Sequence, residues 1–218
     1  MYILTEIIKE DMKPALGVTE PGAIAFAVAK AKSYITEEIE KVKVRLNSGI
    51  YKNAFTCGIP NSDEVGNLFA AALGVVAGKA DRGLESLEDV TKEDNKKAQK
   101  LIDEGKIKVE LNRISSDIFI EVEIITQKEN SIVRIEGTHT NIVEIIVNGE
   151  TIFSKELEKK EENKEEIVLH RYSVKDILKY IDNVDISEIE FIMKAHDMNM
   201  ILFQEGLNNK KTTFVKQL

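Results

Sequence analysis

The chain has little cysteine, little proline and no tryptophan: its 218 residues include one cysteine, Cys57, and three prolines. A single thiol excludes an internal disulfide framework and any cysteine-rich metal site that this chain would build alone. The absence of tryptophan removes one aromatic platform for nucleic-acid bases. The three histidines, His139, His170 and His196, lack the paired spacing of metal ligands. We therefore expect no metal site in this chain.

Long apolar runs and an excess of positive charge are also missing. No window reaches the about 18 consecutive apolar residues of a membrane-spanning helix, and the N-terminus lacks the basic and apolar regions of a signal peptide. The formal net charge of −8 disfavours binding to nucleic acid or to anionic membranes. These absences predict a cytoplasmic protein whose partners include neither nucleic acid nor a membrane.

Common catalytic signatures do not occur either. The chain contains no phosphate-binding P-loop, no dinucleotide glycine fingerprint and no Gly-x-Ser-x-Gly nucleophile elbow. What the sequence offers instead is three polar clusters at the ends of predicted helices and strands: Thr19-Glu20, residues 48–53 (SGIYKN) and residues 138–141 (THTN). Any binding or catalytic site is therefore expected at these clusters.

The segment 14–32, PALGVTEPGAIAFAVAKAK, is the one around which we expect the fold to form. It contains a proline of the kind favoured in the first turn of a helix, followed by small apolar side chains. The resulting helix, Pro21–Lys32, is apolar on all sides and should be buried on all sides. Its first turn has unpaired backbone N–H groups, where an anionic group can bind. The Thr19-Glu20 entrance is thus either the floor of a small-molecule site or the cap of an ordinary core helix.

Periodicity and capping signals predict the other elements. Alternation of apolar and polar side chains predicts a strand, and a serine or threonine three residues before an acidic residue predicts a helix N-terminus. The expected helices are Leu4–Met12, Val65–Ala77 (packed closely against another element), Thr91 to about Glu104, Ser173 to Ile181 and Ser187 to about Glu205, the last ended by Gly206. The expected strands are Lys41–Leu46, Ile50–Phe55 (as strand or loop edge), Ile107–Leu111, Ile118–Ile125, Ser131–Glu136, Asn141–Val147 and Glu150–Phe153, with a hairpin turn at Asn148-Gly149.

These elements predict an α+β fold: a mixed or antiparallel β-sheet packed with helices. We expect this domain to occupy residues 1–154. Residues 155–166 are charged with mixed signs, which indicates a linker or strand end; a recognition tail is the alternative, disfavoured because the two signs nearly cancel. Residues 167–218 are expected to form a C-terminal helical extension.

Several side chains in and near the polar clusters allow two interpretations. His139, flanked by hydroxyl and amide groups between two strands, is either a catalytic residue or a structural one. Tyr51 and Asn53 either line a site or satisfy buried backbone groups. Cys57, near a helix N-terminus, is either an activated thiol or a small buried side chain. The residues alone leave these alternatives open.

Five motifs, in order along the chain, match a known family: LGVTEPGAIAFAVAKAK, SGIYKNAFTCGIPNSDEVGNLFAAALGVVAG, GLESLEDVT, THTNIV and NG. Over residues 8–207 the chain resembles the L-cysteine desulfidase family, which is related to bacterial-type L-serine dehydratases. The resemblance implies a cytoplasmic iron–sulfur lyase of amino-acid catabolism, which eliminates the β-substituent of cysteine to give sulfide, ammonia and pyruvate. More remotely, the layout is similar to the β-domain of two-part L-serine dehydratases.

Two departures from the family pattern limit what the resemblance implies. Val18 stands where the family has the cysteine of a Leu-Gly-Cys-Thr-Glu-Pro motif. The family's second, helical half, with a glycine- and serine-rich substrate loop and further cysteines, has no counterpart in this chain. An iron–sulfur cluster requires several thiolates. The resemblance therefore implies an N-terminal half with no cluster of its own. In the full-length, cluster-bearing enzyme it would be joined to the missing C-terminal half or to a separate cluster-bearing subunit.

The resemblance also implies a site. The residues expected to contact a small amino acid, cysteine or serine, are Thr19, Glu20, Asn53, His139 and Asn141, and His139 is also the candidate catalytic residue. The base otherwise belongs to the missing half or to the position of Val18. One shared site requires Thr19, Asn53 and His139 to converge on one concave surface.

The alternative function is a free-standing, non-catalytic module that binds an amino acid or a partner subunit. The missing motif cysteine favours this alternative, because valine supplies neither a thiolate nor a base. The sequence therefore leaves open whether the chain is an enzyme, and it leaves a homodimer open as well.

Overall fold

A computed structural model describes residues 3–12, 14–155 and 169–208 of the chain. The chain divides into two compact units, residues 1–14 with residues 160–218, and residues 15–159. The predicted domain boundaries stay predictions. The charged segment 155–166 lies outside the described residues beyond Lys155, and so do residues 209–218 of the predicted extension. Within the described residues, no helix combines the length and the apolar composition that crossing a bilayer requires.

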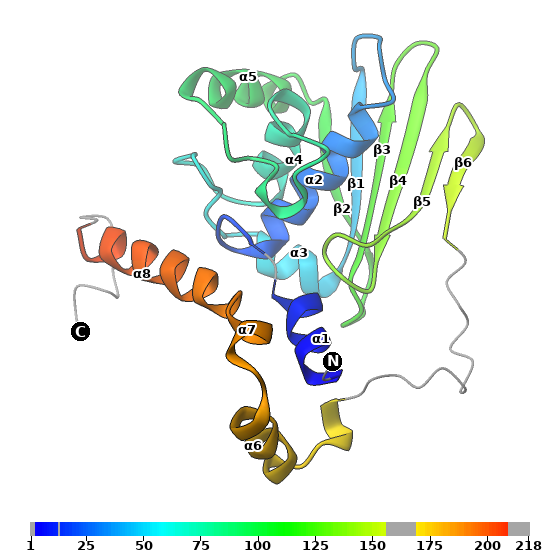
Figure 1. Ribbon diagram of the computed structural model, residues 1–218. Helices are drawn as coiled ribbons and strands as arrows, with labels where there is room; N and C mark the ends of the chain where they lie inside the picture. Colours follow the sequence, from blue (N-terminus) through cyan, green and yellow to red (C-terminus); the bar gives the residue numbers. More distant parts are fainter. Residues whose placement is uncertain (1–2, 13, 156–168, 209–218) are drawn as a thin grey trace. The chain divides into compact units, whose positions relative to one another are not determined.

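The larger unit is a six-stranded sheet with helices packed on one face (Figure 1). The strands are β1 (Lys41–Asn47), β2 (Ile107–Arg113), β3 (Phe119–Ile125), β4 (Asn130–Glu136), β5 (Ile142–Val147) and β6 (Glu150–Ser154). Their order is β2-β1-β3-β4-β5-β6, in which β1 and β2 are parallel and every other neighbouring pair is antiparallel. The predicted α+β class, with a mixed sheet packed with helices, is confirmed.

The predicted alternation of the strands sets which face of the sheet is covered. In β1, Val42, Val44 and Leu46 are fully buried, as their spacing predicts. The paired strand β3 places Val122 opposite Val44 on the same face. These apolar side chains belong to the single core shared by the sheet and the helices.

The helices of this unit are α2 (Thr19–Lys32), α3 (Ser48–Ala54), α4 (Asn67–Val76), α5 (Lys92–Asp103) and the short 3₁₀ helix η1 (Gly83–Glu85). Helix α2 was predicted to be buried on all sides. This prediction is confirmed, since every residue from Pro21 to Ala29 is buried. Helix α4 packs closely against it, as predicted. A Cβ atom at Gly74 would lie 2.8 Å from the Ala25 carbonyl oxygen, so this backbone approach requires glycine.

The prediction of a strand or loop edge over Ile50–Phe55 is wrong, because these residues form most of α3. Strand β1 ends at Asn47, whose buried side chain accepts a hydrogen bond from the Phe119 N–H and donates one to the Ser115 carbonyl. The four-residue spacing of Ile50 and Ala54, the two buried residues of α3, is helical. This spacing could have indicated a helix. It was missed because strand β1 ends directly before it, so the hydrophobic period changes from two to 3.6 residues within a short stretch.

Two local signals are confirmed as predicted. The Thr91 side chain accepts from the Asp94 N–H while the Asp94 carboxylate accepts from the Thr91 N–H, which is the reciprocal capping box that begins α5. Asn148 and Gly149 have φ angles of 53° and 82° and join β5 to β6. Positive φ at both central residues is what a type I′ hairpin turn requires.

The smaller unit is helical in its described residues. Its elements are α1 (Ile3–Asp11), the 3₁₀ helix η2 (Leu169–Arg171), α6 (Val174–Asn183), α7 (Ile186–Ile189) and α8 (Ile192–Asn208). The predicted capping box of Ser173 and Asp176 begins α6, as expected. Within this unit the Thr5 hydroxyl of α1 lies 2.8 Å from the Tyr180 hydroxyl of α6.

One long helix capped by Ser187 is a wrong prediction for this unit. The Asp185 carboxylate accepts from the Ser187 N–H, so capping occurs two residues earlier and begins the four-residue α7. The long helix α8 starts at Ile192 and continues through Gly206 to Asn208. A helical glycine costs only about 1 kcal/mol, which is too little to end a helix by itself.

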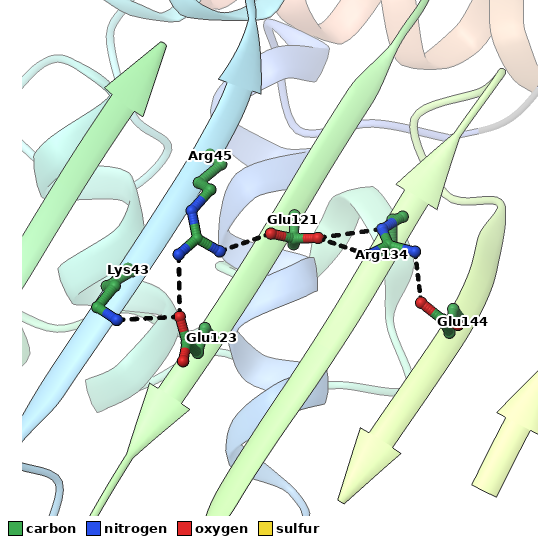
Figure 2. Close-up of polar contacts among 6 residues, drawn as sticks. All are labelled: Lys43, Arg45, Glu121, Glu123, Arg134 and Glu144. Carbon is green, nitrogen blue, oxygen red and sulfur yellow. Dashed lines mark hydrogen bonds and ion pairs between the residues drawn. The ribbon is translucent and has the colours of Figure 1, made fainter. Parts of the chain in front are cut away.

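The second face of the sheet carries an ionic ladder, defined as Lys43, Arg45, Glu121, Glu123, Arg134 and Glu144 (Figure 2). Glu121 is central: its Oε1 accepts from Arg45 Nη1 at 2.6 Å and its Oε2 from Arg134 Nη2 at 2.7 Å. Arg134 also donates to Glu144, and Glu123 accepts from both Lys43 and Arg45. The ladder therefore links β1, β3, β4 and β5.

The Glu121 carboxylate is more stable ionised in the fold than in water. Its side chain is only 14% exposed, and this burial opposes the charged form. The hydrogen bonds and charges of Arg134 and Arg45 outweigh that cost, so the pKa of Glu121 lies below its ordinary value of 4.5. A depressed pKa adds stability that is present above the unfolded pKa and is lost as pH falls through the folded one.

Substituting Glu121→Gln should lower the free energy of unfolding at neutral pH by about 1–2 kcal/mol, because two arginines lose their shared anion. The difference between variant and wild type should shrink in urea titrations as pH falls from about 4.5 through the lowered pKa of Glu121, because the wild-type side chain then loses its charge as well. Glu150→Gln, at an exposed strand position, serves as the matched control and should change little. A loss that stays the same in acid would contradict the ionic explanation.

Candidate functional site

Four of the five side chains expected at a site form one hydrogen-bonded polar cluster, defined as Thr19, Glu20, Asn53 and His139. Asn53 Nδ2 donates to Glu20 Oε1 at 2.8 Å, and Thr19 Oγ1 donates to Glu20 Oε2 at 3.3 Å. Thr19 Oγ1 also lies 3.4 Å from His139 Nε2. The structure thus brings together Thr19, Asn53 and His139 around Glu20. The predicted concavity of their surface stays a prediction.

Three separate segments of the larger unit supply these side chains. Thr19 and Glu20 begin α2, Asn53 lies in the last turn of α3, and His139 lies in the turn between β4 and β5. The backbone before α2 is extended at Val18, whose apolar side chain makes no capping hydrogen bond. In the first turn of α2, Pro21 has no N–H and the Glu20 N–H bonds to its own carboxylate, which leaves the Thr19 N–H without a partner inside the helix. The Glu20 carboxylate lies at the positive end of the helix dipole.

The Glu20 carboxylate is ionised at neutral pH. Partial burial opposes its charge, but the hydrogen bond from Asn53 is the largest of several effects that favour it. A hydrogen bond from its own backbone N–H, the nearby His139 and the Thr19 hydroxyl add to that effect. Together they hold the pKa of Glu20 below its ordinary value of 4.5.

The His139 imidazole is neutral at neutral pH. Burial lowers the pKa of His139, and the charge of Glu20, which acts in the opposite direction, does not fully compensate. A threonine hydroxyl has a single proton to donate. When Thr19 donates that proton to Glu20, its oxygen can only accept from His139 Nε2–H, which leaves the other ring nitrogen able to accept a proton.

Asn141, the fifth expected residue, has different partners. Its Nδ2 donates to the Glu136 carbonyl at 2.9 Å, and its Oδ1 accepts from Lys155 Nζ at 3.0 Å. These contacts tie the β4–β5 turn to the residue after β6. Its role as a substrate ligand stays a prediction, because its described hydrogen bonds do not reach the polar cluster.

Two further residues lie beside the cluster along the chain. Val18, directly before Thr19, is 47% exposed. Cys57 is partly buried, and its Sγ donates to the Asn53 carbonyl at 2.7 Å. Sequence reasoning missed this contact and the Asn53–Glu20 hydrogen bond. The Cys57–Asn53 contact could have been predicted from the four-residue spacing of the two residues, which is helical. The prediction of a strand for this segment prevented that.

The residues present do not fit the iron–sulfur cluster that the family resemblance implies. Such clusters are held by several cysteine thiolates, and the whole chain has one cysteine. Among the residues described, no group of three or more histidine, cysteine, aspartate or glutamate side chains is placed to hold a metal ion. We therefore derive no chemical step through a cluster in this chain.

Comparison with known proteins identifies relatives that are about twice as long as this chain. A UPF0597 protein of Caldanaerobacter subterraneus subsp. tengcongensis is 37% identical over 211 residues, which cover 96% of this chain and 50% of that protein. A UPF0597 protein of Clostridium tetani is 39% identical over 211 residues, with 95% and 49% covered. One of Clostridium botulinum strain Loch Maree is 37% identical over 210 residues, with 95% and 48% covered.

The chain thus spans about half the length of the curated relatives it matches. The relatives' printed names state no activity. No protein-family model matches the chain, and no solved structure matches it. The chain is therefore similar to UPF0597 proteins over about one half of their length.

The coupling between Glu20 and His139 can be measured directly. Glu20→Gln removes the one charge that raises the pKa of His139, so the histidine should titrate at a lower pH in the variant than in the wild type. NMR titration of the imidazole protons gives both values. The control Glu150→Gln changes an exposed glutamate on β6 and should leave His139 unaffected. An unchanged or raised His139 pKa in Glu20→Gln would refute the coupling.

Proposed function

We propose that this chain is the N-terminal half of a cytoplasmic lyase of the L-cysteine desulfidase and serine dehydratase type, and that its polar cluster binds the amino-acid substrate. The observation that carries the proposal is the convergence of Thr19, Glu20, Asn53 and His139 from three segments. The motifs that carry the family resemblance contain all four residues. The proposal includes a fold like that of the β-domain of serine dehydratases.

The charges of the cluster suit a zwitterionic amino acid. The ionised Glu20 carboxylate pairs with the substrate ammonium group, and Asn53 holds that carboxylate in place through its 2.8 Å hydrogen bond. The Thr19 N–H, at the start of α2, is the donor proposed for the substrate carboxylate, because Pro21 has no N–H and the Glu20 N–H bonds to its own carboxylate. An amino acid bound in this way has its Cα–H bond beside the cluster.

The reaction proposed for the whole enzyme is a β-elimination. A base accepts the α-proton, the C–H electrons form the Cα=Cβ bond, and the Cβ–S or Cβ–O bond breaks with its electrons on the leaving sulfide or hydroxide. The resulting 2-aminoacrylate tautomerises to an imine, which water hydrolyses to pyruvate and ammonia. His139, neutral and able to accept a proton, is the base that this chain offers. The half of the relatives that the chain does not match is the other place for that base.

Val18 favours a second candidate function, a non-catalytic module that binds an amino acid or a partner subunit. The family resemblance implies a cysteine at this position, and Val18 is exposed directly beside the polar cluster. A valine supplies neither a thiolate nor a proton acceptor. In this second case the cluster binds the amino acid while the chemistry is absent or belongs to another subunit.

If the cluster binds the substrate, the chain should bind L-cysteine and L-serine in calorimetric titrations. Glu20→Gln should weaken binding by about tenfold or more, because the ammonium group loses its charged partner, and tenfold corresponds to about 1.4 kcal/mol. His139→Asn should weaken it as well. Glu150→Gln and His196→Asn, which change the same residue types at exposed positions, are the matched controls. Equal binding by Glu20→Gln and the wild type would eliminate this site.

The reaction itself is tested on a full-length relative, the UPF0597 protein of Clostridium tetani. Purified without oxygen, it should release sulfide and pyruvate from L-cysteine, or pyruvate from L-serine, whereas this chain alone should release neither. Release by the relative together with binding by this chain supports the lyase half. Binding without any release from the relative favours the non-catalytic module, and release of pyruvate by this chain alone shows that no second half is needed.

A further inference from the structure

The helices of the smaller unit expose apolar side chains to an unusual extent. Helix α8 has no buried residue in its length. Near its centre Ile201, Leu202 and Phe203 are 60%, 54% and 50% exposed. The other exposed large apolar residues of α8 are Met193, Met198, Met200 and Leu207.

These side chains do not form one face. Successive residues of an α-helix are about 100° apart around the axis, so the consecutive residues 201–203 already span more than half of its circumference. Met193 and Met200, seven residues apart, lie on the side that these three leave open. Over one turn, residues 200–203, α8 is therefore apolar on all sides, and a helical turn of this kind belongs inside a core. Polar side chains, among them Asp197 and Glu205, lie before and after that turn.

Helix α6 adds an independent observation. Val174, Leu178 and Ile181 are all exposed and have the i, i+4, i+7 spacing of one helical face. The same helix has a second apolar surface toward α1, where Ile177 and Tyr180 line an apolar groove with Leu4 and Ile8. One face of α6 is therefore occupied within the unit while another stays uncovered. Contiguous exposed apolar surface of this kind marks a protein interaction site.

The relatives indicate what covers this surface. The match to the Caldanaerobacter protein includes 96% of this chain, so most of α8 must lie within it. The same match accounts for only 50% of that protein. The relatives therefore carry a segment corresponding to α8 together with a further polypeptide of about the same length as this chain.

We infer that α8 is a core helix of a second, helical domain, and that the half of the UPF0597 polypeptide unmatched by this chain packs around α8 and the Val174–Leu178–Ile181 face of α6. The partner is a polypeptide surface that is apolar where it meets these helices. It surrounds the apolar turn of α8 at residues 200–203 instead of contacting one side of it. This inference concerns assembly and holds whether or not the polar cluster binds an amino acid.

Hydrogen–deuterium exchange followed by mass spectrometry tests the inference on whole proteins. In this chain the α8 amides should exchange rapidly, because α8 has no buried side chains. In the full-length Clostridium tetani relative the corresponding segment should exchange at least about a hundredfold more slowly, while strands β1 and β3 are protected in both proteins. Equal exchange of the α8 segment in the two proteins, whether fast or slow, overturns the inference.

A variant distinguishes two possible partners of α8, the unmatched half of the relatives and a second copy of this chain. If a second copy covers α8, light scattering should show a defined dimer that Ile201→Glu converts to monomer, and that result also overturns the inference. If the second half is the partner, the chain is a monomer, and Ile201→Glu leaves its midpoint of thermal unfolding unchanged. The control Ile114→Glu replaces a residue that is 90% exposed in the larger unit and should behave like the wild type.

Discussion

The burial of α2 is the constraint on which the rest of the larger unit depends. Its small side chains let both the sheet and α4 approach closely, and Gly74 removes the one Cβ atom that would hold α4 away from Ala25. The end of the helix is fastened as well, since Ser131 of β4 donates to the Ala31 carbonyl and Lys32 donates to the Val75 carbonyl of α4. A helix fixed along its length and at its C-terminus has a fixed N-terminus, which is where the polar cluster begins.

The cluster combines two different electrostatic environments. Glu20 stays ionised because hydrogen bonds to its carboxylate exceed the cost of its partial burial, whereas His139 stays neutral because burial exceeds the attraction of Glu20. An anion beside a neutral proton acceptor is the pair on which the proposed recognition of an ammonium group and removal of a neighbouring proton depend. The pair results from side chains that come from different elements, so it exists only in the folded unit.

Local features were predictable from the sequence, and contacts between distant segments were not. The capping boxes at Thr91 and Ser173, the Asn148-Gly149 turn and the alternation of β1 depend on residues a few positions apart, and each is found as predicted. The cap predicted at Ser187 is an exception, since Asp185 caps the helix there. Helix α3 was missed because a buried strand end and a helix start adjoin at Asn47. The polar cluster depends on two long-range hydrogen bonds. The bonded residues are 33 positions apart in one and 120 positions apart in the other, and hydrophobic periodicity cannot predict such contacts. The polar residues at the ends of predicted elements indicated which segments could supply a site, and the family resemblance grouped Thr19, Glu20, Asn53 and His139 into one.

The buried side chain of Asn47 has a consequence for how β1 and β3 find their alignment. The outward residues Lys43 and Arg45 are both basic, and their partners Glu123 and Glu121 are both acidic. A shift by two residues that brings Arg45 opposite Glu123 would leave Lys43 opposite Ile125, so charge favours the native alignment by one of its two pairs. Asn47 accepts from the Phe119 N–H at the end of the pair, and a shifted alignment would lose this hydrogen bond as well. Charged pairs and one neutral amide therefore both favour the same alignment of the two strands.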